Sequence, residues 1–144
     1  MDRAIVLATD TKAAPKEIVD AVSTEEGERG FWTAKSSVEP RVGSTAVFGF
    51  PGTEATVKMR VDEIGSDAVR WTCLGDFPHW ERSTVTWTTG PAPSGPGTRI
   101  VFRHEHFSGD YPEAEFGSVA YTWALILERL QRYLDSGKPQ PFFP

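Results

Sequence analysis

Residues 113–137, EAEFGSVAYTWALILERLQRYLDSG, decide the fold predicted for this chain. Apolar side chains recur at alternating spacings of four and three residues, which places them on one side of an α-helix. These residues are Phe116, Ala120, Trp123, Leu127, Leu130 and Leu134. Gly137 supplies the left-handed residue that ends a helix, and Pro139 prevents its continuation. A helix about 35 Å long with an apolar stripe needs a broad apolar surface to lie on.

The residues before this helix alternate between apolar and polar side chains, which is typical of strands. One apolar and one polar face per strand predict an antiparallel sheet with one covered side. Short connections, such as the turn at residues 65–67, favour a meander. The expected strands are Ser37–Glu39, Thr45–Phe50, Glu54–Ile64, Ala68–Gly75, Arg82–Thr89 and Thr98–Phe107.

The N-terminal part predicts one strand and two short helices. Arg3–Thr9 contains an apolar run suited to a strand covered on both faces. Residues 15–22 carry a proline in the first turn and one apolar stripe, so we expect a short helix. Ser23 and Glu26 have the spacing of a capping box, which predicts the start of a second helix there. The element order of one strand, two short helices, six strands and a long helix indicates the α+β class.

Length and composition exclude several classes of protein. A chain of 144 residues has the length of one domain, and we place this domain at residues 1–138, followed by a loosely attached tail at 139–144. The net charge of -5, without any basic tract, argues against nucleic-acid binding. One cysteine, Cys73, excludes an internal disulfide. The sequence has no apolar run for membrane insertion and no secretory signal, so we expect a cytoplasmic location.

These patterns resemble the START-like or SRPBCC superfamily over roughly residues 4–138. The resemblance rests on Trp32 after the paired helices, and on the spacing of Trp123, Leu127, Leu130, Leu134 and Gly137. Glu39–Gly43 is similar to the turn before the third strand in the branch that contains heat-shock chaperone ATPase activator homologues and polyketide cyclase-like proteins. Gly97–His104 is similar to the Gly-Thr start of that branch's last strand.

The resemblance implies a helix-grip (START/Bet v-like) fold. In this fold a strongly curved antiparallel sheet wraps around the long C-terminal helix, often with a cavity between them. Members of the superfamily bind lipids, hormones, polyketides or partner proteins, and some are enzymes. The motifs that carry the resemblance are patterns of fold and not catalytic signatures. The activity therefore has to be argued from the site itself.

The apolar strand faces and the helix predict a cavity that binds a small hydrophobic or aromatic molecule without converting it. The expected lining residues are Trp32, Phe48, Met59, Trp71, Cys73, Trp87, Phe102, His104, Tyr121 and Trp123. His104 would be a polar handle, Tyr121 or Trp123 a lid, and Phe50 part of the same apolar wall. The alternative, weighed equally, is that these large side chains fill the space completely.

The sequence contains few groups that could carry chemistry. His104 and His106 lie two apart on one expected strand and so share a face, and with Cys73 they are types of metal ligand. A hydrogen-bonded histidine beneath a helix is the commoner arrangement, so we expect no metal, no cofactor and no catalytic residue. Asp76, His79 and Glu81 lie close together in a loop, flanked by aromatic residues. Acid–base chemistry there would need a carboxylate or imidazole aimed into the cavity, and a solvated loop tip is the commoner arrangement.

Two alternative functions follow from the same pattern. A chaperone-activator-like interaction module would use the outer sheet face or a strand edge to bind a protein partner. The outer face is rich in Thr, Arg and Lys without a large apolar patch, which makes this interpretation weaker. An enzyme of the polyketide cyclase or aromatase kind would use His104 or a loop carboxylate as general base.

Overall fold

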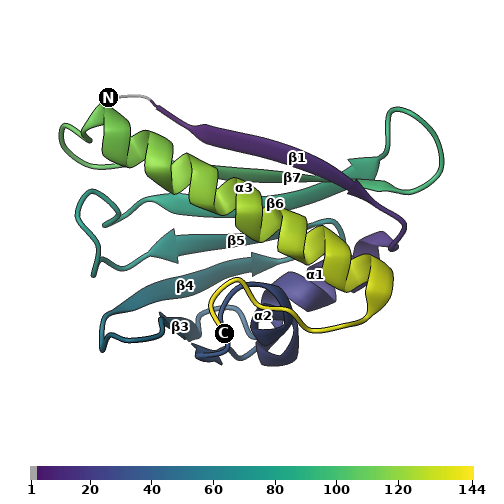
Figure 1. Ribbon diagram of the computed structural model, residues 1–144, viewed down its shortest axis with the longest axis horizontal. Helices are drawn as coiled ribbons and strands as arrows, with labels where there is room; N and C mark the ends of the chain where they lie inside the picture. Colours follow the sequence, from purple (N-terminus) through teal and green to yellow (C-terminus); the bar gives the residue numbers. More distant parts are fainter. Residues whose placement is uncertain (1–2) are drawn as a thin grey trace.

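One antiparallel sheet of seven strands forms the centre of the computed structural model, which describes residues 3–144 (Figure 1). The strand order is β1-β7-β6-β5-β4-β3-β2, so consecutive strands from β2 to β7 are neighbours, as in a meander. The strands are β1 (Ile5–Thr11), β2 (Ser36–Ser37), β3 (Thr45–Gly49), β4 (Thr56–Ile64), β5 (Ala68–Cys73), β6 (Thr84–Pro91) and β7 (Thr98–Glu105). Residues 1 and 2, part of the expected domain, lie outside the described residues.

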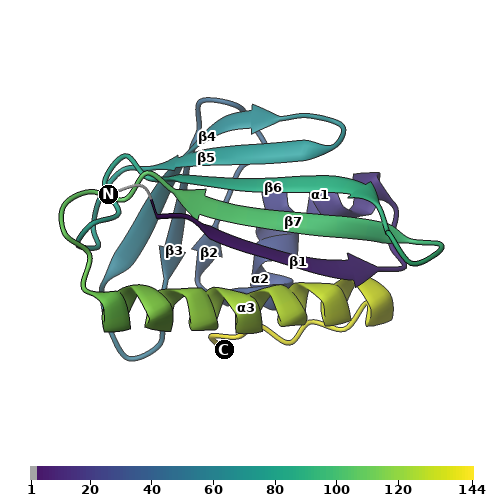
Figure 2. The same cartoon turned by 90° about the horizontal axis from the view of Figure 1, so that it is seen from above.

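Three helices accompany the sheet, namely α1 (Pro15–Ser23), α2 (Glu25–Phe31) and α3 (Glu113–Ser136). In Figure 2 the sheet curves from β4 and β5 round to β1, and α3 lies along the open side of the curve. Gly137 ends α3 with a φ of 74°, and its amide donates to the Tyr133 carbonyl at 2.8 Å. The helix-grip fold is therefore confirmed. Over residues 3–144, no helix combines the length and the apolar character that a membrane crossing requires.

The core between the sheet and α3 is aromatic, as the strand alternation predicted. Trp87 and Phe102 are directly opposite on β6 and β7, with ring centroids 4.8 Å apart. Trp71 of β5 lies 6.0 Å from Trp87, and Trp123 of α3 lies 4.5 Å from Phe102. All four rings are buried. The predicted convergence of these four residues on one interior is confirmed.

Two details of the N-terminal part differ from expectation. The cap of α2 is Thr24, whose side-chain oxygen accepts from the Gly27 amide at 3.2 Å, and not Ser23. Ser23 instead ends α1 and donates its hydroxyl hydrogen to the Val19 carbonyl at 2.6 Å. β1 is an edge strand with only one covered face, and Val6 is 49% exposed. The expectation that this strand is covered on both faces was wrong, because α3 packs on one face only.

The C-terminal residues 139–144 are attached to the fold. The amides of Phe142 and Phe143 donate to the carbonyls of Phe31 and Trp32 at 3.0 and 2.8 Å. In Figure 1 the segment turns back from the end of α3 and runs beside α2. The expectation of a loose tail was wrong, because backbone hydrogen bonds with a distant segment cannot be read from local sequence.

The contact between α1 and α2 yields a stability prediction. A Cβ atom at Gly27 would lie 2.0 Å from the carbonyl oxygen of Ala21, and backbone cannot yield without separating the two helices. Gly27→Ala should therefore lower the free energy of unfolding by at least about 1–3 kcal/mol in urea denaturation. Gly117→Ala is the matched control, because no atom lies within 4 Å of a Cβ there. The control should gain about 0.5–1 kcal/mol from helix propensity. Equal stability of the two variants would contradict this packing.

Candidate functional site

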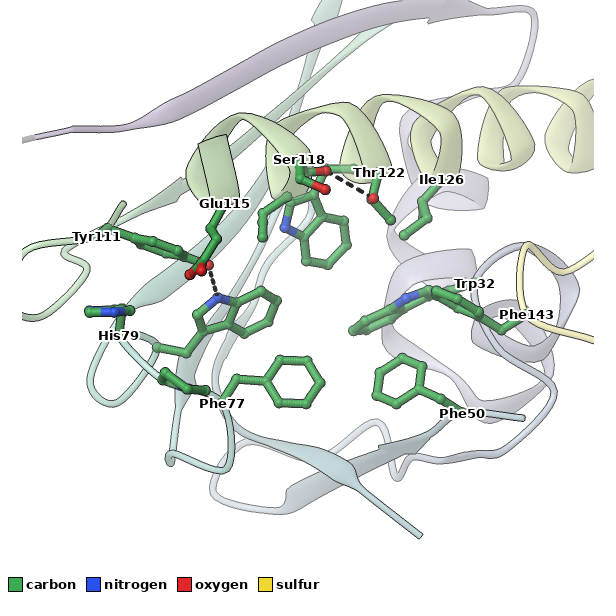
Figure 3. Close-up of a pocket in the computed structure, with 14 residues that line it drawn as sticks. Trp32, Phe50, Phe77, His79, Tyr111, Glu115, Ser118, Thr122, Ile126 and Phe143 are labelled. Atoms are coloured by element: carbon green, nitrogen blue, oxygen red, sulfur yellow. Dashed lines mark hydrogen bonds between the residues drawn. The ribbon is translucent and has the colours of Figure 1, made fainter. Parts of the chain in front are cut away.

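A pocket of about 310 Å³ lies where the N-terminal half of α3, the loop at residues 74–83 and the C-terminal segment meet (Figure 3). Every lining residue belongs to a loop, to α3 or to the C-terminal segment, and none to a strand. The lining residues are Trp32, Phe50, Phe77, Pro78, His79, Trp80, Tyr111, Glu115, Ser118, Val119, Thr122, Trp123, Ile126 and Phe143. The pocket is thus at the end of the sheet and not beneath its centre.

Five of these side chains form a closed circuit of aromatic rings, which we call the five-ring wall. Its members are Trp32, Phe50, Phe77, Trp80 and Trp123. In that order, successive ring centroids lie 6.5, 5.8, 5.1 and 6.3 Å apart, and 5.0 Å closes the circuit from Trp123 to Trp32. Rings at these distances are in contact, so the wall is continuous and apolar. Figure 3 shows Phe50 beside Trp32 and across the pocket from Ser118 of α3.

Polar groups gather at the α3 side of the pocket. Trp80 Nε1 donates to the Tyr111 hydroxyl at 3.1 Å, which leaves the hydroxyl hydrogen of Tyr111 free to donate. Burial raises the pKa of Tyr111, and the nearby Glu115 carboxylate adds to the effect. His79 stacks on Tyr111 at 4.6 Å, and its Nδ1 donates to the Ser108 carbonyl at 2.7 Å. The rim therefore offers a phenol, an imidazole and a carboxylate.

The loop that supplies one wall of the pocket is conformationally strained. Asp76, His79 and Arg82 have φ values of 82°, 71° and 68°, a region that non-glycine residues rarely adopt. Such strain persists only when surrounding contacts hold the chain in place, and it concentrates at functional sites. Here the contacts include the stacking of His79 on Tyr111. The loop is fixed against α3 by this packing, which favours a preformed pocket.

The structure brings together only part of the predicted ligand site. Trp32 and Trp123 line the pocket, and so does Phe50 from the expected apolar wall. Seven other predicted residues are buried in the core and do not line it: Phe48, Met59, Trp71, Cys73, Trp87, Phe102 and His104. Tyr121 is 68% exposed on α3 and is not a lid. The strand residues fill the space beneath the helix, so an opening exists only where the strands end.

Sequence reasoning missed Trp80, Tyr111 and Phe143 as pocket residues. Phe77 and Trp80 were visible as aromatic residues in a loop, which is a usable signal for a binding surface. Nothing in the local sequence of Phe143 or Tyr111 indicates that they meet this loop. Their position depends on how the chain ends pack in the folded protein.

His104 joins the sheet to α3 through two buried hydrogen bonds. Trp123 Nε1 donates to Nδ1 of His104 at 3.2 Å, so the imidazole hydrogen is on Nε2, which donates to the Ser83 hydroxyl at 2.9 Å. Burial lowers the pKa of His104 to about 3, which keeps the ring neutral. Both nitrogens are engaged and neither reaches the pocket. The geometry therefore supports neither the predicted polar handle nor a general base at this position.

The two histidines near the end of β7 do not share a face. β7 ends at Glu105, and His106 adopts a φ of 67°, which breaks the alternation. The exposed His106 ring contacts the Thr84 hydroxyl at 3.0 Å, while Phe107 covers His104 at 4.3 Å. Across residues 3–144 no three His, Cys, Asp or Glu side chains are placed to hold a metal ion.

The remaining candidate groups also lie away from the pocket. Cys73 is buried as predicted, and burial raises the pKa of its thiol. Asp76 is 3.6 Å from Lys58 in an ion pair, and Glu81 is exposed. Neither carboxylate lines the pocket, so the alternative of a loop carboxylate as general base is not supported by the geometry.

Glu28 of α2 is a buried acid without a hydrogen-bond partner among the described residues. Burial raises its pKa well above the ordinary value, because an unpaired carboxylate is costly in an apolar interior. Burial therefore favours the protonated form of this side chain in the folded protein. Local sequence does not indicate this burial, because Glu28 lies in a segment of charged residues.

This raised pKa predicts a pH-dependent stability difference. The folded protein keeps the Glu28 proton above pH 4.5, where the unfolded chain releases it, so folding becomes less favourable as pH rises through the folded-state pKa. Glu28→Gln removes this titration. Relative to Glu28→Gln, the wild type should lose stability as the pH rises above about 4.5 in urea unfolding. A difference that does not change with pH would contradict a protonated Glu28.

Comparisons with solved structures agree with the fold. The solution structure of the Aha1 dimer from Colwellia psychrerythraea has a TM-score of 0.80 and 24% identity, covering 94% of this chain and 98% of that chain. The crystal structure of DynU16, a protein of the dynemicin biosynthetic locus, has a TM-score of 0.78 and 22% identity. It matches 99% of this chain and 51% of its own, so the present chain spans about half the length of DynU16.

A further similar structure is CalU16 from Micromonospora echinospora, with a TM-score of 0.70, 17% identity, and coverage of 97% of this chain and 78% of that chain. No protein-family model and no curated protein matches the sequence. At these identities the likeness establishes the fold, and it agrees with the activator-homologue branch to which the sequence resemblance points. The function has to be argued from the pocket.

Proposed function

We propose that the protein binds a small aromatic or hydrophobic molecule inside the five-ring wall, without converting it. The observation that carries this proposal is the pocket itself, which is apolar, has a few polar groups at one side and is built from a strained loop. Binding sites for small molecules typically have this composition. The helix-grip fold places the pocket beside α3, as is common for the superfamily that the sequence resembles.

The size of the pocket limits the ligand. A volume of about 310 Å³ is at the lower end for organic ligands, and it corresponds to about ten water molecules at roughly 30 Å³ each. A molecule with on the order of ten non-hydrogen atoms, such as one bicyclic aromatic group, fits this volume. A longer ligand would extend past Glu115 and Ser118, which are exposed at the rim.

The surface favours this proposal over a docking module. The large hydrophobic side chains exposed among residues 3–144 are Val6, Val42, Leu74 and Tyr121, and they come from four separate segments. Stable protein interfaces have an apolar or aromatic centre, and four exposed hydrophobic side chains offer little area for one. In the five-ring wall, by contrast, several aromatic side chains border one opening.

Binding can be located with tryptophan indole signals in proton–nitrogen correlation NMR. Unlabelled indole is a suitable probe, and an affinity on the order of 1 mM is expected for a molecule this small. The indole N–H signals of Trp32, Trp80 and Trp123 should shift on titration. Those of the core residues Trp71 and Trp87 should move much less, because neither lines the pocket. Equal shifts of all five signals, or none, would contradict binding at this site.

A pair of tryptophan substitutions on α3 tests the pocket by filling it. Ser118 lines the rim and is exposed, so Ser118→Trp should place a ring in the opening and weaken indole binding about tenfold or more. Ala124→Trp is the control, because Ala124 is exposed on the same helix and does not line the pocket. Both variants should keep the wild-type melting temperature. Unchanged binding in Ser118→Trp would contradict the assignment.

A further inference from the structure

The lining of the pocket contains a negatively charged type of side chain but neither Lys nor Arg. Among its lining residues, Glu115 has the one carboxylate side chain. Glu115 forms no salt bridge and no side-chain hydrogen bond with residues 3–144. Figure 3 shows its carboxylate pointing from α3 toward Tyr111, beside the five-ring wall. The negative charge of the rim is therefore available to a ligand.

Two cationic side chains approach pocket residues from outside the lining. Arg3 donates to the backbone carbonyl of Tyr111 and also lies 4.6 Å from the Phe116 ring. Lys35 is 3.4 Å from the backbone carbonyl of Phe50. Both are directed at carbonyl oxygens, and neither lines the pocket. Neither Arg3 nor Lys35 therefore contributes a positive charge to the pocket lining.

Aromatic faces carry negative potential, and tryptophan attracts cations most strongly among the side chains. The wall contains three tryptophans, Trp32, Trp80 and Trp123, and all three are largely buried. A cation in such surroundings gains from the rings and from the carboxylate together. An anion of the same size would meet the Glu115 charge and find no cationic side chain in the lining. A neutral molecule gains from apolar contact and from any hydrogen bond with the rim, but not from attraction to the charge.

We propose that the ligand is a hydrophobic organic cation, an aromatic or alkyl ammonium compound, whose charged group lies between the five-ring wall and Glu115. This inference rests on the proposed binding function and adds the chemical class of the ligand. The aromatic or alkyl part occupies the wall, and the ammonium group faces the rim. Glu115 is the specificity-determining residue, because it distinguishes a cation from a neutral molecule of equal size.

The test compares three soluble probes of similar size: benzyltrimethylammonium, benzylacetone and hydrocinnamate, which are cationic, neutral and anionic. Each is titrated by the shifts of the Trp32, Trp80 and Trp123 indole signals, in about 0.15 M salt to screen the net charge of the protein. The cation should bind about tenfold more tightly than the neutral probe, and the anion more weakly than either. Glu115→Gln should reduce the cation preference to about threefold.

Glu113→Gln is the matched control, since Glu113 lies in the same first turn of α3 and does not line the pocket. It should leave the preference unchanged. Equal or tighter binding of benzylacetone would overturn this inference and leave the proposed function standing. A cation preference that stays about tenfold in Glu115→Gln, or that Glu113→Gln lowers equally, would overturn the role of Glu115. Failure of all three probes to shift any indole signal would contradict the proposed function as well.

Discussion

The hydrogen bond from Trp123 to His104 fixes the helix against the sheet at the point where the core meets the pocket. Trp123 Nε1 donates to a histidine that burial keeps neutral, and the other histidine nitrogen is held by Ser83. The Trp123 ring lies 4.5 Å from Phe102 in the core and 5.0 Å from Trp32 in the five-ring wall. Trp123 therefore belongs to both the core and the five-ring wall, and its packing in the core holds the wall in place.

The pocket lies beyond the strand ends because side chains fill the core beneath α3. Large strand side chains occupy the space that other arrangements of this fold could leave open, and seven residues expected to line a cavity are buried instead. Aromatic interiors pack to high density, so remaining volume appears where the strands end. There the strained loop, the start of α3 and the C-terminal segment enclose it (Figure 3). The location of the site follows from packing and not from a motif.

Much of the fold could be predicted because it depends on periodicity. The spacing along α3, its end at Gly137 and the inward faces of the strands follow from local pattern. The pattern shows which face is covered, but not how much volume remains between two faces. The kink at His106 and the docking of Phe143 on Trp32 depend on backbone angles and distant contacts. For this reason two of ten expected ligand residues line the pocket, while the loop and the C-terminal segment supply much of the rest.

The central claim is that the five-ring wall encloses a space which an aromatic molecule occupies. The most direct measurement is a crystal structure of the protein grown with indole at high concentration. The account predicts indole density bounded by Phe50, Phe77, Trp80 and Trp123, with those side chains placed as in the free protein. A pocket closed by the Phe77 ring, or indole bound only on the outer surface, would contradict it.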